Sequence, residues 1–240
     1  MARPVLACLH HLERPSLGLA EAPLRAAGLE LDERRVTEGD PLPELGDVAG
    51  IVSFGGAQSV RGIDSEPALE AEAALLREAV EREVPVLGIC LGGQLLAHAL
   101  GGEVGRLERR TVAWWELEPA AAAEGDPVLG ALGAPVLALH FNEDGFSLPP
   151  GAVELLGRGG ASVEGFRAGR AAWGVQFHPE ADGPLLEDWY VNYRPWIDQA
   201  GVDPEELRAA GERCLPRQAE QADALFRAFA RVVLDDAARR

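Results

Sequence analysis

The residues best suited to chemistry lie near the middle of the chain, where a cysteine stands between two glycines. Gly88, Cys90 and Gly92 form a Gly-x-Cys-x-Gly pattern where an apolar run gives way to a helical one. Such a strand-to-helix turn exposes a nucleophilic side chain, because small neighbours permit a tight bend. The following helix favours the thiolate through its dipole and its unpaired N–H groups. The pattern therefore indicates a thiol nucleophile at Cys90.

Two other interpretations of this turn stay open when the cysteine is considered alone. A free cysteine is often a small buried hydrophobic residue, and a glycine-rich loop can hold a phosphate. The phosphate interpretation is the weaker one, because all 22 basic residues are arginines. A chain without lysine has neither a Walker lysine nor a Schiff-base lysine.

A thiol nucleophile needs a base, and the base needs a group that orients it. His178 ends an apolar strand and precedes Glu180 by two residues. Side chains two apart on a strand point to one side, and Pro179 keeps His178 extended. Glu180 can then fix the imidazole tautomer while the other ring nitrogen faces Cys90; a surface His-Pro turn is the alternative. The other four histidines are interpreted as structural: His10, His11, His98 and His140.

Cleavage of an amide also needs hydrogen-bond donors for the oxyanion of a tetrahedral intermediate. In a turn of this kind, one donor is the N–H of the residue after the nucleophile, here Leu91. We expect the second from Gly55 or Gly56 in the stretch "SFGGAQS", because glycines leave backbone N–H groups accessible. An ordinary turn is the alternative interpretation of these two glycines.

The elements expected around these residues follow the rhythm of βαβ units on a parallel sheet. A helix is expected from Glu66, with Ser65 as a possible N-cap and Pro67 in the first turn. It leads into a buried strand at 84–89 and a helix at 91–100, with Cys90 on the turn between them. The earlier apolar runs are expected as strands: 4–9, 29–36 and 48–54, with a helix at 16–27.

The second half of the chain changes character. Gly and Pro clusters separate its apolar runs, which favours an antiparallel meander. The last sixty residues turn helical, with Asp203 as a helix cap and Pro216 as an interruption. The strands expected here are 112–117, 135–139, 153–156, 162–167 and 171–177.

The composition excludes several kinds of partner. A net charge of −17 repels phosphates, so neither nucleic acid nor an anionic membrane surface is expected. No apolar run approaches the roughly 20 residues of a membrane span, and the first residues do not resemble a signal peptide. Cys8, Cys90 and Cys214 are widely separated and suit a reducing compartment. We therefore expect a cytoplasmic protein.

The sequence indicates neither a metal nor a cofactor. The histidines lack the spacing of metal ligands. Carboxylate clusters such as Glu78, Glu81 and Glu83 indicate a solvated helix face. The expected chemistry therefore belongs to the side chains themselves.

Taken together, these motifs resemble those of the class I (triad) glutamine amidotransferases. The stretch "GICLGGQ" at 88–94 is similar to their nucleophile motif, "FGG" at 54–56 to their oxyanion loop, and "FHPE" at 177–180 to their His-x-Glu ending. The resemblance covers roughly residues 1–180, with the motifs in family order. It is closest to stand-alone members similar to the amidotransferase half of GMP synthase.

The resemblance implies roles for individual residues. Cys90 would be the nucleophile, His178 the base and acid, Glu180 its orienting group, and Gln94 a contact for bound glutamine. Three positions depart from the family pattern: Ala57 replaces a proline, Asn142 replaces a histidine, and "TVAW" at 111–114 lacks an acidic residue and a glycine. These departures leave the triad intact and bear on whether free glutamine is the substrate.

The predicted fold is α/β: a flavodoxin-like open, mostly parallel sheet flanked by helices, with an antiparallel extension and a helical C-terminal segment. Residues 1–183 would form the amidotransferase-like domain, and 184–240 a helical extension packed on the same domain. Trp189, Tyr193 and Trp196, spaced i, i+4, i+7, indicate core packing or a homodimer contact; a contact with another partner is the alternative.

The predicted activity is cysteine-dependent hydrolysis of a glutamine side-chain amide through a thioester. Because the chain carries no acceptor domain, the ammonia would pass to a separate synthetase subunit. The alternatives are a free-standing γ-glutamyl amide hydrolase, a binding or regulatory protein that keeps the fold without turnover, and a cysteine hydrolase of another family.

Overall fold

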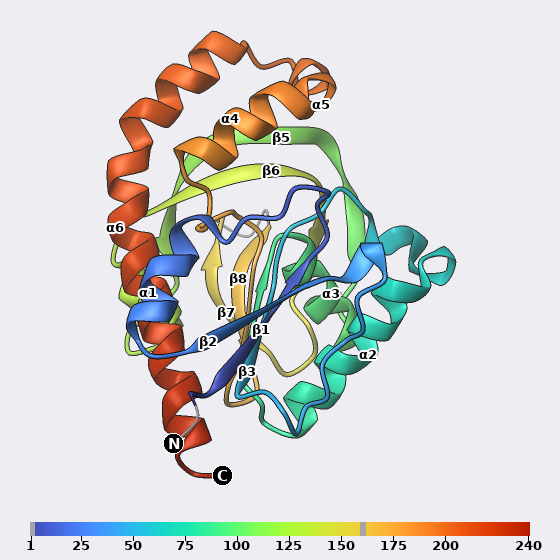
Figure 1. Ribbon diagram of the computed structural model, residues 1–240. Helices are drawn as coiled ribbons and strands as arrows, with labels where there is room; N and C mark the ends of the chain where they lie inside the picture. The colour runs from blue at the N-terminus through green and yellow to red at the C-terminus, as the bar shows by residue number, and fades with distance from the viewer. Residues whose placement is uncertain (1–2, 159–161) are drawn as a thin grey trace.

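One curved mixed sheet runs through the molecule (Figure 1). The computed structural model describes residues 3–158 and 162–240. Within them the strands pair in the order β2-β1-β3-β4-β9-β8-β7-β5-β6. The strands are β1 (Val5–His10), β2 (Glu30–Arg35), β3 (Gly50–Ser53), β4 (Val86–Ile89), β5 (Val104–Pro119), β6 (Val136–Phe146), β7 (Val153–Gly157), β8 (Val163–Ala168) and β9 (Ala172–Val175).

Helices cover both faces of this sheet, which confirms the predicted α/β fold. The α-helices are α1 (Glu21–Ala26), α2 (Pro67–Glu81), α3 (Leu91–Ala99), α4 (Gly183–Asn192), α5 (Arg194–Ala200) and α6 (Pro204–Ala237). The short 3-10 helices are η1 (Gly18–Ala20), η2 (Val36–Glu38), η3 (Val60–Ser65), η4 (Ala121–Ala123) and η5 (Leu129–Leu132).

Five strands form the parallel half of the sheet. β1 pairs in parallel with β2 and β3, β3 with β4, and β4 with β9. β3, β4 and β9 are buried along their whole length, as apolar strands covered on both faces should be. The carboxyl ends of parallel strands meet at one edge, so the loops that follow β1, β3, β4 and β9 gather there.

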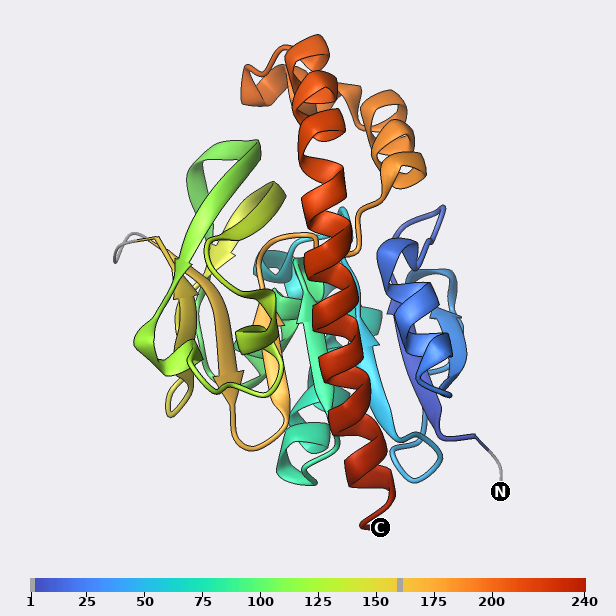
Figure 2. The ribbon, with the colours of Figure 1, turned by 90° about the vertical axis from the view of Figure 1, so that its left-hand side faces the viewer.

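Alternate side chains of β1 enter two different layers of core. Leu6 and Cys8 pack with α1 and α6, whereas Ala7 and Leu9 pack with α2 and α3. This is the two-residue period of a strand that is covered on both faces. Figure 2 shows α6 running along one face of the sheet down to the C terminus. The parallel half is therefore the middle of a three-layer arrangement.

The remaining strands extend the sheet by antiparallel pairing. β8, β7 and β5 follow β9 in order, and β6 pairs with β5 at the outer edge. β5 and β6 arch over the edge where the loops gather (Figure 1). Both strands are longer than predicted. The prediction followed apolar residues, whereas β5 continues to pair with β6 through a stretch of charged residues. Arg106 and Arg110 on β5 form ion pairs with Glu143 on β6.

Two predicted helix signals are wrong and two are confirmed. Ser65 belongs to η3, and Glu66 occupies the N-cap of α2 without a side-chain bond, although Pro67 does lie in the first turn. Pro216 does not interrupt the last helix, because α6 continues through it. A proline inside a helix costs about 3 kcal/mol, and packing of α6 on both sides of Pro216 offsets that cost. Asp203 caps α6 as predicted and accepts a bond from the N–H of Glu205.

The aromatic stripe at the start of the C-terminal segment does not lie on one helix. Trp189 is on α4, Tyr193 is the residue between α4 and α5, and Trp196 is on α5. Their rings surround Phe141 of β6, with centroids 5.3, 6.3 and 6.1 Å away. Inward packing was one of the two predicted roles of these side chains; a homodimer contact stays a prediction.

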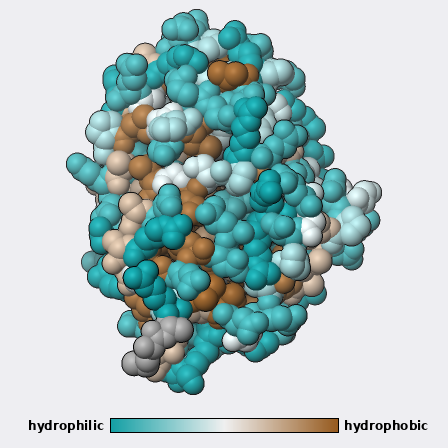
Figure 3. All heavy atoms as spheres, in the orientation of Figure 1, coloured by the Kyte–Doolittle hydropathy of each residue, from teal (hydrophilic) through white to brown (hydrophobic). Residues whose placement is uncertain are grey.

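The face of the molecule in Figure 3 is mostly hydrophilic. Teal, hydrophilic atoms cover much of the face in Figure 3, and brown atoms gather mainly in its left half. In the described residues, the large hydrophobic side chains with high exposure are Leu148, Val153 and Val191. None of the helices in residues 3–158 and 162–240 is both long enough and apolar enough to cross a membrane.

Candidate active site

Cys90 occupies a strained turn between β4 and α3. Its backbone has φ 52° and ψ −106°, a conformation that residues other than glycine rarely adopt. β4 ends at Ile89 and α3 begins at Leu91, so the bend is confined to the cysteine itself. The N–H of Cys90 donates to the carbonyl of Val175 on β9, 2.8 Å away. The turn predicted from the sequence is therefore present, and it holds Cys90 at the edge where the loops gather.

The flanking glycines are required because backbones approach closely here. A Cβ atom at Gly92 would lie 2.1 Å from the carbonyl oxygen of Ser53 at the end of β3. A Cβ atom at Gly88 would lie 2.5 Å from the carbonyl oxygen of Gly92. Any side chain at either position would push α3 away from β3 and β4. The glycines thus fix the position of the helix N-terminus beside the thiol.

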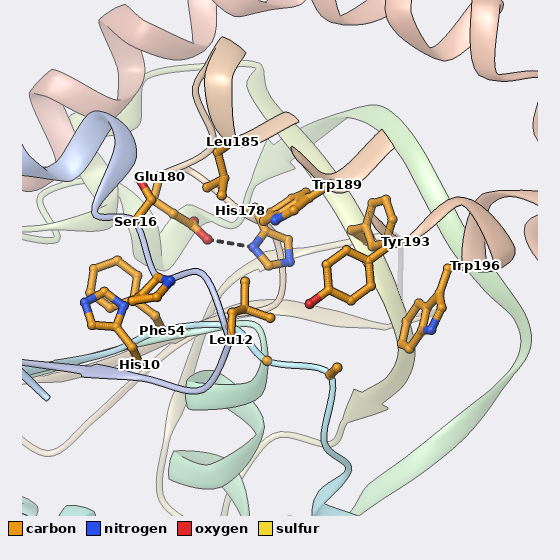
Figure 4. Close-up of a pocket in the computed structure, with 15 residues that line it drawn as sticks. His10, Leu12, Ser16, Phe54, His178, Glu180, Leu185, Trp189, Tyr193 and Trp196 are labelled. Atoms are coloured by element: carbon orange, nitrogen blue, oxygen red, sulfur yellow. Dashed lines mark hydrogen bonds and ion pairs between the residues drawn. The ribbon is translucent and has the colours of Figure 1, made fainter. Parts of the chain in front are cut away.

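His178 and Glu180 follow β9 and are bonded to each other. Glu180 Oε1 lies 2.7 Å from His178 Nδ1, and both side chains are buried (Figure 4). The N–H of His178 donates to the carbonyl of Leu139 on β6, which holds the backbone of this loop in place. A carboxylate accepts the Nδ1–H, so His178 Nε2 is the nitrogen left for chemistry. Within the described residues His178 Nε2 has no hydrogen-bond partner.

The structure brings Cys90 and His178 to the same point beside Gly55. A Cβ atom at Gly55 would lie 2.7 Å from His178 Cε1 and 3.6 Å from Cys90 Cβ. Burial alone would lower the pKa of the His178 imidazole. The charges of Cys90 and Glu180 outweigh burial and raise that pKa to about 10. The arrangement therefore favours an imidazolium at His178, held between Cys90 and Glu180.

The backbone groups predicted to bind an oxyanion lie around the same thiol. Leu91 is the first residue of α3, so its N–H has no carbonyl one turn back within the helix. Gly55 and Gly56 follow β3, and the carbonyl of Phe54 before them accepts the N–H of Gly92 at 3.3 Å. That bond ties the oxyanion loop to the start of α3. The geometry is compatible with the predicted oxyanion role, which stays a prediction.

A buried polar network that the sequence motifs did not predict lies behind the oxyanion loop. His11 Nε2 lies 2.7 Å from Glu72 Oε2, and His11 Nδ1 lies 3.0 Å from the carbonyl of Phe54. Ser53 donates to the other oxygen of Glu72 at 2.6 Å. A carbonyl can only accept, so His11 donates to Phe54. Burial lowers the pKa of His11, and the charge and hydrogen bond of Glu72, with the neighbouring carbonyls, raise it above its ordinary value.

This network fixes the loop that carries Gly55 and Gly56. His11, Glu72 and Ser53 come from the loop after β1, from α2 and from β3, and all three are buried. A supporting role for His11 agrees with its interpretation as a structural residue. No short sequence motif could predict the network, because Glu72 is 61 residues from His11 in the chain.

Gln94 lies close to the thiol but is engaged with the protein itself. Its amide donates to the carbonyl of Asp144 at 3.1 Å and to the side chain of Gln176 at 3.2 Å. Asn142, where the family usually has histidine, also donates to the carbonyl of Asp144. Gln94 as a contact for glutamine stays a prediction.

Gln176 is a second residue at the site that the sequence motifs did not predict. Its amide donates to Cys90 Sγ at 3.7 Å, from a position two residues before His178. The two-residue period of an extended segment is the signal that could have found it, since it places Gln176 on the same side as His178.

An aromatic cavity opens on His178 and the oxyanion glycines. Trp189, Tyr193 and Trp196 form one wall, and Leu12 and Phe54 lie on the opposite side (Figure 4). Phe141, which packs against these three rings, also lines the cavity. The edge of the Trp189 ring packs against the imidazole, with centroids 4.8 Å apart. The cavity therefore begins at the group that would move protons.

The fold, the strained turn at Cys90 and the buried pair of His178 and Glu180 together define an α/β protein with a thiol and an imidazole at one edge of its sheet. Residues 22–188 match the family model described as glutamine amidotransferase class-I. The chain belongs to this family. Membership confirms the predicted resemblance and the predicted enzyme class, a hydrolase of the glutamine amidotransferase type.

Relatives of this chain carry the same family name or that of GMP synthase. The glutamine amidotransferase-like protein YfeJ of Salmonella typhimurium is 30% identical over 72% of this chain and 75% of its own. One subunit of the glutamine-hydrolyzing GMP synthase of Haloarcula marismortui is 34% identical over 77% of this chain and 90% of its own. The chain is therefore similar to both proteins along most of their length.

Solved structures show the same fold almost end to end. A glutamine amidotransferase from Thermotoga maritima superposes with a TM-score of 0.85 at 24% identity, covering 96% of this chain and 99% of that one. A glutamine amidotransferase from Methylobacillus flagellatus gives a TM-score of 0.82 at 27% identity, covering 96% and 95%. Both coverages extend past the family model, so the neighbours share the C-terminal helices in outline.

Proposed function

We propose that the protein hydrolyses the side-chain amide of glutamine through a thioester on Cys90 and passes the ammonia to a separate synthetase subunit. The observation that carries the proposal is the position of His178. Its Nδ1 is held by Glu180, its Nε2 is unpaired within the described residues, and Cys90 lies beside its ring. Family membership and the likeness to glutamine-hydrolyzing GMP synthases support the choice of glutamine.

In the first half of the reaction, the Cys90 thiolate attacks the carbonyl carbon of the amide. The N–H of Leu91 and that of Gly55 or Gly56 donate to the oxygen as it becomes negative. His178 Nε2–H then gives its proton to the leaving nitrogen, and the carbon–nitrogen bond breaks. The products of this half are ammonia and a γ-glutamyl thioester on Cys90.

In the second half, neutral His178 takes a proton from water, and the oxygen of that water attacks the thioester. The carbon–sulfur bond breaks, the thiolate returns and glutamate leaves, so the imidazolium and thiolate are restored. Glu180 accepts the Nδ1–H throughout, keeping Nε2 directed at the reacting atoms. Proton transfer of this kind contributes about 10²–10⁴-fold to a rate.

The proposed ammonia acceptor is a second protein. Support comes from the similarity to a separate subunit of the glutamine-hydrolyzing GMP synthase of Haloarcula marismortui, which this chain matches along 90% of its length. A glutamine-hydrolyzing GMP synthase of Aeropyrum pernix matches this chain over only 28% of its own length. We propose a cytoplasmic location as well, because the free cysteines Cys8, Cys90 and Cys214 suit a reducing compartment.

The test is hydrolysis of glutamine by the purified chain, followed as glutamate formed. We expect Cys90→Ala to abolish turnover and Cys214→Ser, at a partly exposed helical position, to retain it. Denaturing mass spectrometry of a rapidly quenched reaction should show a γ-glutamyl adduct that requires Cys90.

Turnover that is unchanged in Cys90→Ala would overturn the thioester mechanism. A folded wild-type protein that binds glutamine with neither adduct nor turnover would instead establish the non-catalytic alternative.

A further inference from the structure

A second buried pair of histidine and glutamate lies outside the site described so far. His140 Nε2 lies 2.7 Å from Glu164 Oε2, and the two residues are 1% and 2% exposed. His140 is on β6 and Glu164 is on β8. These strands are not neighbours in the sheet, because β7 and β5 lie between them. The side-chain contact therefore joins two strands that no backbone pairing joins directly.

The extended segment 176–178, which ends at His178, runs between the same two strands. The N–H of Gln176 donates to the carbonyl of Glu164 at 3.0 Å. The N–H of His178 donates to the carbonyl of Leu139 at 2.9 Å, and the next residue of β6 is His140. The two strands that His140 and Glu164 connect are therefore the strands that hold the backbone of His178.

The alternation of side chains places His140 behind this segment. Successive side chains of an extended chain point to opposite sides. Gln176 lies on the thiol side, where its amide donates to Cys90 Sγ, and His178 lies on the same side. Phe177 therefore points the other way, and its ring lies 6.5 Å from the ring of His140. The pair thus supports the segment from the side opposite to the thiol.

The partners of the pair leave it one arrangement. Glu164 Oε1 accepts from the hydroxyl of Ser162, and Oε2 faces His140, so both carboxylate oxygens are used. The His140 ring also packs against Trp115, with centroids 4.2 Å apart. Within residues 3–158 and 162–240, His140 Nδ1 has no hydrogen-bond partner. One carboxylate and two aromatic side chains, Trp115 and Phe177, therefore set the orientation of this ring.

Stability alone does not explain a polar pair at this place. Taking a carboxylate and an imidazole out of water opposes folding, and an apolar pair of similar volume is often as stable or more stable. Apolar contact is not directional, however. The 2.7 Å contact between His140 and Glu164 fixes both the separation and the orientation of the strands that carry them. The pair therefore supplies position where an apolar pair would supply only cohesion.

We propose that His140 and Glu164 are a positioning pair, which sets the place of His178 relative to Cys90 by fixing β6 and β8 on the two sides of segment 176–178. The pair acts through the backbone of this segment. Its effect on turnover rests on the thioester mechanism proposed above, in which His178 Nε2 moves a proton in both halves of the reaction. A misplacement of about 1 Å can cost about 10²-fold in rate.

The first experiment measures kcat and KM for glutamine in the full chain. The double variant His140→Phe with Glu164→Leu removes both polar partners, so it leaves no unpaired buried charge and should fold. We expect kcat to fall by about 10–100-fold. KM should change by less than about twofold, because a group that acts only on the chemical step leaves binding unchanged.

Two single variants of Glu164 complete this comparison. Glu164→Gln can still accept from His140 and donate to Ser162, so it should retain most of kcat. Glu164→Leu leaves a neutral imidazole at His140 instead of an unpaired charge. It provides the same test as the double variant and is expected to show the same fall in kcat.

The control loosens the same strand at its other end. Gln221 on α6 accepts the N–H of Leu137 at 3.0 Å and donates to the carbonyls of Leu132 and Pro135 at 2.9 and 3.1 Å. Gln221→Ala removes these bonds to the start of β6 and its preceding loop. We expect a lower melting temperature, with kcat within about twofold of wild type.

A second experiment needs no substrate. Hydrogen exchange followed by mass spectrometry measures how well the backbone N–H groups of Gln176 and His178 are protected. Their exchange should be about tenfold faster in the double variant than in wild type, because β6 and β8 no longer hold the segment at a fixed separation. In Gln221→Ala the exchange of this segment should stay as in wild type.

The outcomes separate this inference from the proposed function. If turnover requires Cys90 but the folded double variant keeps the wild-type kcat, the pair is only structural and the inference fails alone. An equal fall in kcat in Gln221→Ala would also overturn it, because any loosening of β6 would then have the same effect. If wild type does not hydrolyse glutamine, the proposed function fails, and unchanged exchange in the double variant would still refute the positioning role.

Discussion

At the level of single residues, the two ring nitrogens of His178 are divided between two tasks. Nδ1 is held by Glu180 at 2.7 Å, which leaves Nε2 for the reacting atoms. The raised pKa of about 10 keeps the imidazolium protonated through neutral pH despite its burial. In the proposed mechanism this proton is the one given to the leaving amine. The alkaline limb of the pH profile should therefore report on His178.

We expect kcat/KM to fall as the pH rises through about 10, because the imidazolium loses its proton there. Glu180→Gln removes one of the charges that raise this pKa, so the alkaline limb should move to lower pH. The rate at neutral pH should also fall by about 10²–10⁴-fold. A pH series of glutamate release measures both effects, with Glu187→Gln, exposed on α4, as the control. An alkaline limb that stays in place in Glu180→Gln would contradict the assignment.

The buried network around Glu72 gives a second prediction for single residues. Ser53→Ala removes the 2.6 Å bond to a carboxylate that is fully buried. The free energy of unfolding should fall by about 1–3 kcal/mol, because a buried acceptor loses a donor. Urea denaturation measures the change, and Ser65→Ala, at an exposed position, should stay within about 0.5 kcal/mol. Equal stability of the two variants would show that Glu72 does not depend on Ser53.

At the level of elements, the catalytic geometry depends on how closely α3 approaches β3. The approach is possible because Gly92 has no side chain where the carbonyl of Ser53 passes. It brings the positive end of the helix dipole to the thiol and the oxyanion loop to the same place. The start of α3, which follows Cys90, and the end of β3, which precedes Gly55, therefore form one packed unit.

We expect Gly92→Ala to destabilise this unit. The new Cβ would lie 2.1 Å from a backbone oxygen, so α3 or β3 must shift, at a cost of about 1–3 kcal/mol or more. Turnover should fall further than stability alone explains, since the thiol moves relative to Gly55. Gly46→Ala, where a Cβ meets nothing within 4 Å, is the matched control. Wild-type activity and melting temperature in Gly92→Ala would refute this account.

What the sequence could predict depends on whether the signal is local. The elbow at Cys90 and the pair of His178 and Glu180 are written within a few residues, and the structure brings them together as expected. The partners of His11 lie far along the chain, and its burial against Glu72 follows only from the packing of α2 on the sheet. The predicted interruption at Pro216 is wrong for a similar reason, because tertiary packing of α6 outweighs the local preference of proline.

At the level of the whole molecule, α6 joins parts that are distant in the chain. Along its length it contributes Leu225, Phe226, Phe229 and Val233 to the core beneath the parallel strands. At its end Asp236 binds Arg170 at 2.6 Å and Arg240 at 2.7 Å. The burial of Asp236 opposes ionisation, but these two guanidinium groups hold its pKa below the ordinary value. The division of the chain at residue 183 stays a prediction, and α6 offers its test.

If residues 184–240 pack on the same domain, a core substitution in α6 must weaken the whole protein at once. Phe229 is fully buried, and its ring meets Trp173 of β9 edge-on at 6.3 Å. Phe229→Ala should therefore lower the free energy of unfolding by about 3–5 kcal/mol, in one cooperative transition seen alike by circular dichroism and by tryptophan fluorescence. Arg231→Ala, exposed on the same helix, should change it little. Two separate transitions in Phe229→Ala would mean that the C-terminal helices unfold apart from the sheet, and that the cavity they cover can open without loss of the catalytic core.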